Sequence, residues 1–273
     1  MLDNCIFITG ASTGIGAALA RHYASPGTRL CLLTNSDPDK LNEVAKSCEA
    51  NGAIVRLFTA NVSDKSLMHE IAGTIISEIG LPNIVIANAG IGPPDPDEYM
   101  ESELPAETMA VNYLGVINTL SGFIEPMKTR GAGCLVAISS VSAMRSTPNS
   151  GIYSASKAAV NMWTEGLRFR LKPHGVNVIT IFPGFVKTVM SENNPFYMPG
   201  IITTDVAARM IGRAIQKRRA RYYLPLLARI IWRSFHYLPD PVYDLVMTLA
   251  KKYWPEKRCG AQAQIRSQPR QEA

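Results

Sequence analysis

The feature that most constrains the fold of this chain is a regular alternation of short apolar runs with longer amphipathic segments. The apolar runs have the length of strands, and nearly continuous runs are typical of parallel strands that helices cover on both faces. Between them, apolar residues recur at helical spacing, as at Leu41, Val44, Ala45 and Cys48. The alternation predicts an α/β fold with a doubly wound parallel sheet and right-handed crossovers. The predicted strands are residues 5–9, 29–34, 54–60, 83–87, 134–139, 176–182 and 221–224, and the main predicted helices are 40–50, 67–79, 108–127 and 153–171.

Length and composition favour a single domain. The chain has 273 residues, of which 47% are hydrophobic, and this is enough for one large core. We interpret residues 1–225 as the α/β domain, 226–254 as a helical extension of it, and the polar residues 255–273 as a disordered tail. No stretch of about 18 uninterrupted apolar residues is present, so no membrane-spanning helix is expected. The start of the chain lacks the basic segment of a signal peptide, so none is expected.

The five cysteines are scattered along the chain, and no pair has the CxxC spacing. This pattern favours reduced thiols and argues against a disulfide framework or a zinc site. We therefore expect a cytoplasmic protein that holds no metal ion.

The positive charge of the chain is concentrated near its C-terminal end. The net charge is +6, yet residues 1–208 contain 14 Lys and Arg against 18 Asp and Glu. Residues 209–258 contain 12 basic residues against 3 acidic residues. A mildly acidic body with one basic segment indicates a local basic surface, for which anionic lipid is a better partner than nucleic acid.

The helical extension has an amphipathic pattern that leaves two interpretations open. An amphipathic basic helix can lie in a membrane interface, which predicts a peripheral contact with the cytosolic face of a membrane through residues 209–258. Alternatively, the apolar stripe packs over the substrate site or against another subunit, and the arginines are simply solvated. The stripe contains Leu226, Leu227, Ile230, Ile231 and Phe235, and the basic side contains Arg229, Arg233 and His236.

A glycine-rich turn follows the first predicted strand. Gly10, Gly14 and Gly16 have the spacing GxxxGxG, and a helical segment follows directly. Gly10 permits a tight turn, Gly14 lets a pyrophosphate approach the backbone, and Gly16 lets the helix pack closely on the strand. The amide groups at the helix N-terminus attract phosphate. Three glycines alone are a weak signal, but a strand before them and a helix after them predict a dinucleotide phosphate-binding turn.

Four polar residues further along the chain form a candidate catalytic set. Tyr153 and Lys157 are four residues apart in a predicted helix, so their side chains share one face. Ser140 lies 13 residues before Tyr153, at the end of a predicted strand. Asn112 lies within a predicted helix, where asparagine is a poor helix former. A tyrosine–lysine pair alone is common by chance, but its combination with the strand-end serine and the glycine-rich turn indicates one site.

With these motifs in this order, the sequence resembles the short-chain dehydrogenase/reductase family, in particular the members with a TGxxxGxG turn and a YxxxK pair. The resemblance covers approximately residues 4–225. It implies a Rossmann-like fold and an oxidoreductase that interconverts an alcohol and a carbonyl compound with NAD(P). The matching residues are 9–16, Asn61, Val62, 88–90, Asn112, Ser139, Ser140, 153–157, Pro183, Gly184 and Thr188.

The resemblance also implies a role for each catalytic candidate. Tyr153 would be the general acid in the reduction and the general base in the reverse reaction. Lys157, with the oxidised nicotinamide, would lower the pKa of that phenol and would bind the nicotinamide ribose. Ser140, rather than Ser139, would hydrogen-bond the substrate oxygen, because the 13-residue spacing favours it. Asn112 would kink its helix and hold a water molecule that relays protons to Lys157.

The cofactor-binding residues follow from the same resemblance. The phosphates would lie at the glycine-rich turn, the adenine at Asn61 and Val62, and the carboxamide at Val186 and Thr188. The family usually has aspartate where this chain has Asn61, but the amide keeps an acceptor. The expected set is Gly10, Ser12, Thr13, Gly14, Ile15, Gly16, Thr34, Asn35, Asn61, Val62, Asn88, Gly90, Tyr153, Lys157, Val186 and Thr188.

The end of the second predicted strand favours NADP over NAD. An NAD enzyme would have a carboxylate there, which binds the ribose hydroxyls and repels a 2′-phosphate. This chain has Thr34, Asn35 and Ser36 instead. The arginine that NADP enzymes often carry at this place is absent, and Thr13 replaces a basic residue often seen in the turn, so NAD stays the alternative.

The residues expected around the substrate are mostly apolar, which favours a lipophilic carbonyl compound or alcohol over a phosphorylated sugar. We therefore expect NADPH-dependent reduction of a lipophilic ketone by a homo-oligomer. The alternative is a non-catalytic nucleotide sensor or scaffold on the same fold, which would usually have lost the tyrosine or the lysine. The expected lining is Ile91, Pro93, Pro94, Val141, Met144, Arg145, Met190, Pro195, Phe196, Tyr197, Met198 and Pro199.

Overall fold

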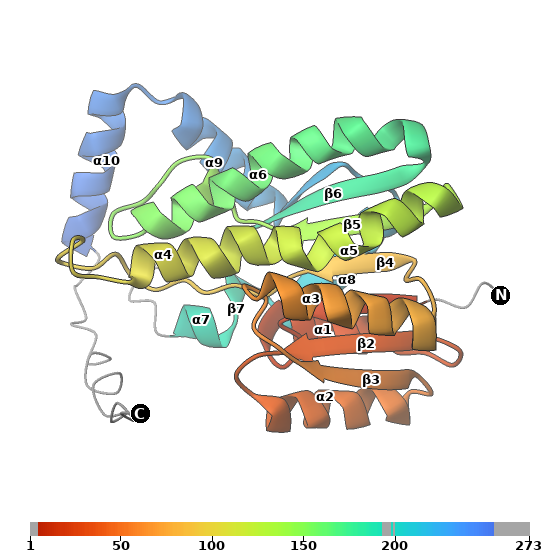
Figure 1. The fold of residues 1–273 in the computed structure, drawn as a ribbon. Helices are drawn as coiled ribbons and strands as arrows, with labels where there is room; N and C mark the ends of the chain where they lie inside the picture. Colours follow the sequence, from red (N-terminus) through yellow and green to blue (C-terminus); the bar gives the residue numbers. More distant parts are fainter. Residues whose placement is uncertain (1–4, 193–197, 199, 254–273) are drawn as a thin grey trace.

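In the computed structural model, which describes residues 5–192, 198 and 200–253, seven strands form one parallel sheet (Figure 1). Their order is β3-β2-β1-β4-β5-β6-β9, so the chain builds one half of the sheet outward from β1 and then the other half from β4. This confirms the predicted doubly wound α/β sheet. A separate pair of very short strands, β7 (Val186–Lys187) and β8 (Ile202–Thr203), lies outside it. The seven strands are β1 (Cys5–Thr9), β2 (Arg29–Thr34), β3 (Ile54–Thr59), β4 (Ile84–Ala87), β5 (Gly133–Ile138), β6 (Val176–Pro183) and β9 (Arg221–Leu224).

Helices cover both faces of the sheet (Figure 1). One face packs against α1, α2 and α8, and the other against α3, α5 and α6. A π-helical turn, Ala110–Leu114, joins α4 to α5. The helix predicted at 108–127 therefore extends over residues 104–130 and contains this π-helical interruption. The helices are α1 (Gly14–Tyr23), α2 (Pro38–Ala50), α3 (Lys65–Thr74), α4 (Leu104–Met109), α5 (Gly115–Arg130), α6 (Gly151–Leu171), α7 (Val189–Glu192), α8 (Thr204–Gln216), α9 (Leu226–Tyr237) and α10 (Asp240–Tyr253).

Alternate residues of the central strands enter the two cores on either side of the sheet. In β1, Ile6 and Ile8 join the core under α1, α2 and α8, whereas Cys5 and Phe7 join the core under α3, α5 and α6. Side chains alternate between the faces of a strand, so a strand buried on both faces needs a continuous apolar run. The run at 5–9 therefore corresponds to a central strand.

The two edge strands, β3 and β9, are less covered than the central strands. β3 lies at the edge of the sheet, and most of its side chains are partly or fully exposed. Ile54 at its start is 66% exposed. The apolar run at 54–60 could not distinguish an edge strand from a central strand, because edge position depends on how the other strands pair.

Local capping signals set the ends of several helices. Asp37 precedes α2, and its carboxylate accepts a hydrogen bond from the backbone N of Lys40 at 3.1 Å. Pro38 occupies the first turn of that helix, where a missing N–H costs nothing. Gly131 ends α5 with a φ of 68°, a left-handed conformation that favours glycine.

The C-terminal extension is a pair of helices, α9 and α10, which are separated by Leu238 and Pro239. The face of α9 that packs on the body contains Ala228 and Trp232, which join Val141 and Phe182 in a small third core. The predicted apolar stripe is divided: Leu226, Leu227 and Ile230 are exposed, whereas Ile231 and Phe235 are half-buried and Phe235 packs against this core. The predicted tail at 255–273 lies outside the described residues. Within the described chain, no helix is long and apolar enough to cross a membrane.

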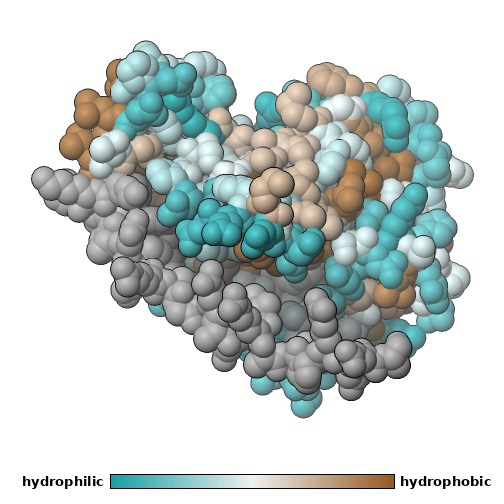
Figure 2. Space-filling model, turned by 60° about the vertical axis from the view of Figure 1, so that its left-hand side comes forward, coloured by the Kyte–Doolittle hydropathy of each residue, from teal (hydrophilic) through white to brown (hydrophobic). Residues whose placement is uncertain are grey.

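Figure 2 turns forward the side of the molecule on which α10 and the start of α4 lie in Figure 1. Apolar residues (brown) are exposed between hydrophilic ones (teal), and the surface is hollowed between two lobes. This face of the described chain is therefore mixed rather than uniformly polar.

Candidate active site

The glycine-rich turn between β1 and α1 packs tightly against the segment that follows β4. Gly10 has a φ of 65°, and a Cβ there would lie 2.8 Å from Cα of Ala89. A Cβ on Gly16 would collide with the carbonyl oxygen of Gly10 and would lie 2.6 Å from Nδ2 of Asn88. Both positions therefore require glycine, Gly10 for its left-handed backbone and both for the close approach of neighbouring atoms.

Asn88 joins the turns that follow β1 and β4. Its Nδ2 donates to the carbonyl oxygens of Thr9 and Gly10, both at 3.0 Å. Its backbone N donates to Oγ1 of Thr9 at 3.2 Å. β1 and β4 are neighbours at the point where the strand order reverses, and ligands of α/β sheets bind at such a point. The predicted cofactor residues Gly10 and Asn88 are thus brought together there.

The N-terminus of α1 has the features of an anion-binding site. Thr13 precedes the helix without capping it through its side chain, and the first turn contains no acidic residue. The amide groups of that turn are available for a phosphate. A Cβ on Gly14 would lie 3.3 Å from Cγ2 of Thr188, so the predicted phosphate and carboxamide contacts lie close together. These features fit a dinucleotide, with Ser12 and Ile15 half-buried beside the turn.

The ends of β1 and β2 meet where the adenosine ribose is expected. Oγ of Ser12 and Oγ1 of Thr34 are hydrogen-bonded at 3.0 Å, and Thr34 is buried while Asn35 is exposed. The nearest acid in sequence, Asp37, is occupied at the start of α2, where it also pairs with Nζ of Lys40 at 2.6 Å. The carboxylate of Asp37 thus caps α2. β2 and residues 35–36 contain no acidic residue, so they place no carboxylate at the expected ribose site.

The predicted adenine contacts lie after β3. Val62 is buried, and its carbonyl oxygen accepts from Nδ2 of Asn118 at 2.9 Å. Asn61 is exposed, and its Oδ1 accepts from the backbone N of Ser63 at 3.0 Å. The acceptor of Asn61 therefore holds its own turn, a local role that an aspartate could equally fill.

The carboxyl end of β5 and the start of α6 bring three of the four catalytic candidates together. Nζ of Lys157 donates to the carbonyl oxygen of Ile138 at 3.1 Å and lies 5.8 Å from the centre of the Tyr153 ring. The hydroxyl groups of Tyr153 and Ser140 lie close enough to interact, and this interaction favours the phenolate of Tyr153. Ser140 and Lys157 are buried. The four-residue spacing and the strand-end position of the serine therefore produce one connected group.

Burial determines the protonation of this group. It raises the pKa of Tyr153 above its ordinary value of 10, and the interaction with Ser140 opposes that change only in part. It also lowers the pKa of Lys157 to about 8. Loss of hydration thus disfavours the phenolate in the chain without its cofactor, and the expected lowering of the Tyr153 pKa, which includes the oxidised nicotinamide, stays a prediction.

Ser139 has a different role from Ser140. Its Oγ donates to Oδ1 of Asn161 at 2.7 Å and to the carbonyl oxygen of Lys157 at 3.2 Å. Both partners belong to α6, so Ser139 fastens the end of β5 to that helix. This arrangement supports the choice of Ser140 as the residue that faces the substrate side.

Asn112 lies in the π-helical turn between α4 and α5 and is fully buried. It exchanges two hydrogen bonds of 2.8 Å with the backbone of Ile91, and its Nδ2 donates to Oγ of Ser156 at 3.0 Å. A Cβ on Gly90 would lie 3.0 Å from Oδ1 of Asn112 and 3.2 Å from Nζ of Lys157. The expected distortion of the helix is thus present, and Asn112 connects the segment after β4 to α6.

Sequence reasoning missed Asp95, which caps the catalytic helix. Its Oδ2 accepts from the backbone N of Gly151 at 2.7 Å, and its Oδ1 accepts from that of Ile152 at 3.0 Å. These are the first amides of α6, directly before Tyr153. A carboxylate is favoured at a helix N-terminus, but this one comes from 56 residues earlier in the chain, so no local pattern predicts it.

The residues expected around the substrate are only partly described. Sδ of Met190 would lie 3.0 Å from a Cβ on Gly92, and Cδ2 of Tyr153 would lie 3.6 Å from the same point. Val189, Met190 and Ile201 are exposed. Of the remaining expected residues, Pro195, Phe196, Tyr197 and Pro199 lie outside the described residues.

Arg145, which we expected at the border of the substrate site, binds the C-terminal extension. Its guanidinium donates to the carbonyl oxygens of Phe235 at 2.8 Å and Leu238 at 2.6 Å, and to Asp240 at 2.7 Å. It also lies 3.7 Å from the centre of the Tyr243 ring. The extension is therefore fastened to the loop between Ser140 and α6, a role that the sequence did not indicate.

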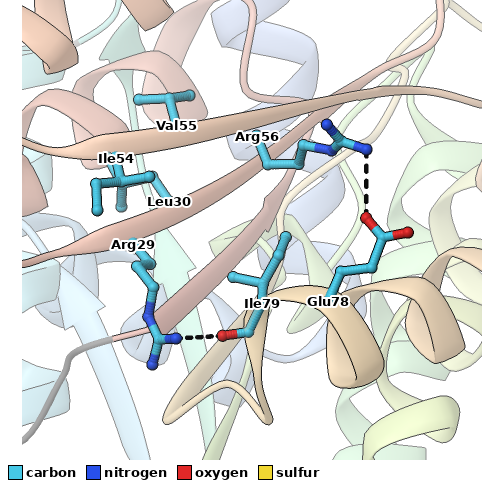
Figure 3. A pocket seen from close by; sticks show the side chains of 7 residues that line it. All are labelled: Arg29, Leu30, Ile54, Val55, Arg56, Glu78 and Ile79. Atoms are coloured by element: carbon cyan, nitrogen blue, oxygen red, sulfur yellow. Dashed lines mark hydrogen bonds and ion pairs between the residues drawn. The ribbon is translucent and has the colours of Figure 1, made fainter.

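A hollow of about 290 Å³ lies at the opposite edge of the sheet (Figure 3). Arg29 there donates to the carbonyl oxygen of Ile79, and Arg56 pairs with Glu78 at 3.3 Å. The hollow lies at the N-terminal ends of β2 and β3, whereas the candidate catalytic residues lie at the C-terminal ends of the strands. It is therefore not part of the candidate active site. Among the described residues, no group of three or more His, Cys, Asp or Glu side chains is placed to hold a metal ion.

The chain was compared with known proteins. The family model for short chain dehydrogenase matches residues 4–195. An uncharacterized oxidoreductase of Myxococcus xanthus (strain DK1622) is 31% identical over 87% of this chain and 93% of its own length. 2,3-dihydro-2,3-dihydroxybenzoate dehydrogenase of Bacillus subtilis (strain 168) is 33% identical over 67% of this chain and 70% of its own length.

Solved structures show the same fold. A short chain dehydrogenase/reductase of Burkholderia phymatum in complex with NAD is 26% identical, with a TM-score of 0.76 over 86% of this chain and 95% of that one. An alcohol dehydrogenase of Thermococcus sibiricus complexed with 5-hydroxy-NADP is 29% identical, with a TM-score of 0.71 over 81% of this chain and 94% of that one. The chain therefore belongs to the short-chain dehydrogenase/reductase family and is an oxidoreductase that uses a nicotinamide dinucleotide.

Proposed function

We propose that this oxidoreductase reduces a lipophilic ketone to an alcohol with NADPH, through Tyr153, Lys157, Ser140 and Asn112. One observation carries the proposal: the interacting side chains of Tyr153 and Ser140, with Nζ of Lys157 at 5.8 Å from the centre of the phenol ring, lie where β5 ends. The glycine-rich turn lies at the same edge of the sheet, where β1 ends. A proton donor and a dinucleotide-binding turn are what carbonyl reduction requires.

The protein residues supply a proton and polarise the substrate oxygen, while the reduced nicotinamide, when bound, supplies the hydride to the carbonyl carbon. Tyr153 donates its phenolic proton to the carbonyl oxygen, which becomes the alcohol hydroxyl. Burial keeps this phenol protonated near neutral pH, because it raises the pKa of Tyr153. Ser140 hydrogen-bonds the same oxygen and stabilises the negative charge that develops on it.

Lys157 returns the proton that Tyr153 gives away. Its pKa is lowered to about 8 by burial, so the ammonium group is present at neutral pH but releases a proton readily. We assign the nicotinamide ribose hydroxyls to the same group. Oδ1 of Asn112 faces the Gly90 position on the same side as Nζ of Lys157, which supports a role in holding a water molecule between them.

The surroundings of Thr34 support NADP rather than NAD. Ser12 and Thr34 offer hydroxyl groups, and the nearest carboxylate in sequence, Asp37, is held by the start of α2. A 2′-phosphate would therefore meet hydrogen-bond donors and no unpaired carboxylate from β2. The other assigned contacts are Gly10, Thr13, Gly14, Ile15, Gly16, Asn35, Asn61, Val62, Asn88, Gly90, Val186 and Thr188.

The apolar character of the residues near Tyr153 supports a lipophilic substrate. Met190 lies beside Gly92 and the Tyr153 ring, and Val189 and Ile201 are exposed on the same loop region. All three side chains are apolar, so none of them could bind a phosphate or carboxylate group of a polar substrate.

We further infer a homo-oligomer in the cytoplasm. Met162 and Phe169 of α6 are 72% and 62% exposed, which supports contact between copies through that helix. The four described cysteines are free thiols, as in proteins of a reducing compartment. Size-exclusion chromatography with light scattering on the wild type and on Phe169→Ser tests the first inference.

A screen of lipophilic ketones with NADPH and NADH tests the main proposal, with Tyr153→Phe as the critical variant. We expect turnover of a ketone by the wild type and a loss of about 100-fold or more in Tyr153→Phe, because general acid catalysis is removed. The matched control Tyr237→Phe changes a tyrosine that is 72% exposed and should keep full activity. Tight cofactor binding without turnover of any ketone or alcohol would favour the nucleotide sensor instead.

A further inference from the structure

We propose that α9 is a peripheral membrane-binding helix, which lies on an anionic lipid bilayer through the side chains of its exposed apolar strip. The strip is defined by Leu226, Ile230 and Tyr237, which are 63%, 57% and 72% exposed. These three large side chains lie on the same face of α9. Their exposure is unusual in a chain that buries most of its large apolar residues.

Pairs of residues four positions apart divide α9 into three faces, because such residues are adjacent on a helix. Ala228 and Trp232 form the face buried against the body. Leu226 and Ile230 form the exposed apolar strip. Arg229 and Arg233 form an exposed basic strip beside it. A helix with an outward apolar strip next to a basic strip is typical of membrane interfaces, whereas solvated surface helices are polar outside.

Exposed apolar side chains are concentrated in the C-terminal extension. In the part of the chain that the structure describes, seven of the 16 exposed large hydrophobic residues belong to α9 and α10. On α10 they are Val242, Leu245 and Leu249, while Tyr243 and Met247 of that helix are buried. Both helices therefore bury one face and leave a second apolar face outward.

The charge of this part of the chain identifies a lipid surface as the partner. Residues 209–258 contain 12 Lys and Arg against 3 Asp and Glu, whereas the body is slightly acidic. Of the two acidic residues in the extension before residue 254, Asp240 is paired with Arg145. A second copy of this chain would bring the same positive charge to the surface, whereas anionic phosphate groups complement Arg229 and Arg233.

The strip is held in a fixed orientation and lies near the candidate active site. Arg145 binds two carbonyl oxygens at the end of α9, and Ala228 packs where a Cβ on Gly184 would lie. Cδ2 of Leu227 would lie 3.3 Å from a Cβ on Gly200, in the loop that follows α7. A bilayer against α9 would therefore lie beside the loops that border the site. Delivery of a lipophilic substrate rests on the proposed function, but binding of the bilayer does not.

Co-sedimentation with vesicles tests the proposal on the full chain. Vesicles of phosphatidylcholine with phosphatidylserine, and of phosphatidylcholine alone, are mixed with the wild type at low and high salt. We expect binding to the anionic vesicles at low salt and release at high salt, since ionic screening weakens the attraction. The double variant Arg229→Glu/Arg233→Glu should bind at least about 30-fold more weakly, because the charges of two basic side chains near the lipid surface are reversed.

A second double variant, Leu226→Ser/Ile230→Ser, removes the apolar strip without touching the basic strip, and it should also lose binding. The matched control Met100→Ser/Lys46→Glu changes an exposed apolar and an exposed basic residue outside the extension, and should bind as the wild type does. All six side chains are exposed, so circular dichroism should show folded proteins. Absence of wild-type sedimentation at low salt, or full binding by either α9 variant, would overturn the proposal. So would a wild-type dimer that Leu226→Ser/Ile230→Ser converts to a monomer, because the strip would then be a contact between copies.

Discussion

Replacing Lys157 by methionine should stabilise the cofactor-free protein at pH 7 while it abolishes catalysis. Lys157 is buried, and its ammonium group donates to the carbonyl oxygen of Ile138. Burial lowers the pKa of Lys157 from an ordinary value of 10.5 to about 8, so the folded state holds the charged form at a cost. Methionine has a similar length and no charge, and it should fill the same space.

The size of the effect follows from the change in the pKa of Lys157. The difference between 10.5 and about 8 corresponds to about 3 kcal/mol by which folding disfavours the ammonium. Loss of the hydrogen bond to Ile138 offsets about 1 kcal/mol of that gain. The variant should therefore gain about 2 kcal/mol in free energy of unfolding at pH 7.

The gain should vanish in alkali. Between pH 8 and pH 10.5 the unfolded chain binds more protons at Lys157 than the folded chain does, so the stability of the wild type rises with pH in this window. Lys157→Met lacks that dependence. By pH 10 the wild type should be at least as stable as the variant, because its lysine is then neutral and keeps the hydrogen bond.

Urea unfolding of both proteins without cofactor, at pH 7 and pH 10, measures this difference, and other titrating groups cancel in the comparison. Lys46→Met, a change of an exposed lysine on α2, is the control and should show no comparable gain at pH 7. A variant that is less stable than the wild type at pH 7, or a gain that persists at pH 10, would refute the reasoning about Lys157.

Three further changes test other parts of the site. Thr34→Asp should reverse a preference for NADPH into one for NADH, because the carboxylate repels the 2′-phosphate; titration of both cofactors decides this, and a wild-type preference for NADH would contradict it. Gly16→Ala should weaken cofactor binding and lower the free energy of unfolding in urea by about 1–3 kcal/mol, because the new Cβ would collide with Gly10 and Asn88. The control Gly73→Ala in α3 should leave both unchanged, because a Cβ there would have no atom within 4 Å. Asp95→Ala should cost about 1 kcal/mol of stability and lower kcat, since α6 loses its cap, and unchanged values of both would contradict a positioning role.

Local patterns along the chain were enough to predict the fold class and to select most residues of the candidate site. Strand and helix differ in the period of their apolar residues, and this local signal survives in any tertiary context. The turn glycines and the Tyr153–Lys157 spacing are also local, so their structural consequences were predictable. The roles assigned to the individual residues came from the family resemblance and stay predictions.

Contacts between segments far apart in the chain could not be predicted from such patterns. Asp95 caps α6 from 56 residues away, and no pattern near either partner encodes that contact. α9 has apolar residues on two of its faces, so periodicity could not tell that Ala228 and Trp232 pack inward while Leu226 and Ile230 stay exposed. Likewise, the direction of the Tyr153 pKa depends on how much water the fold removes from the phenol. Burial depends on all elements that pack around a residue, whereas sequence patterns report only the neighbours along the chain.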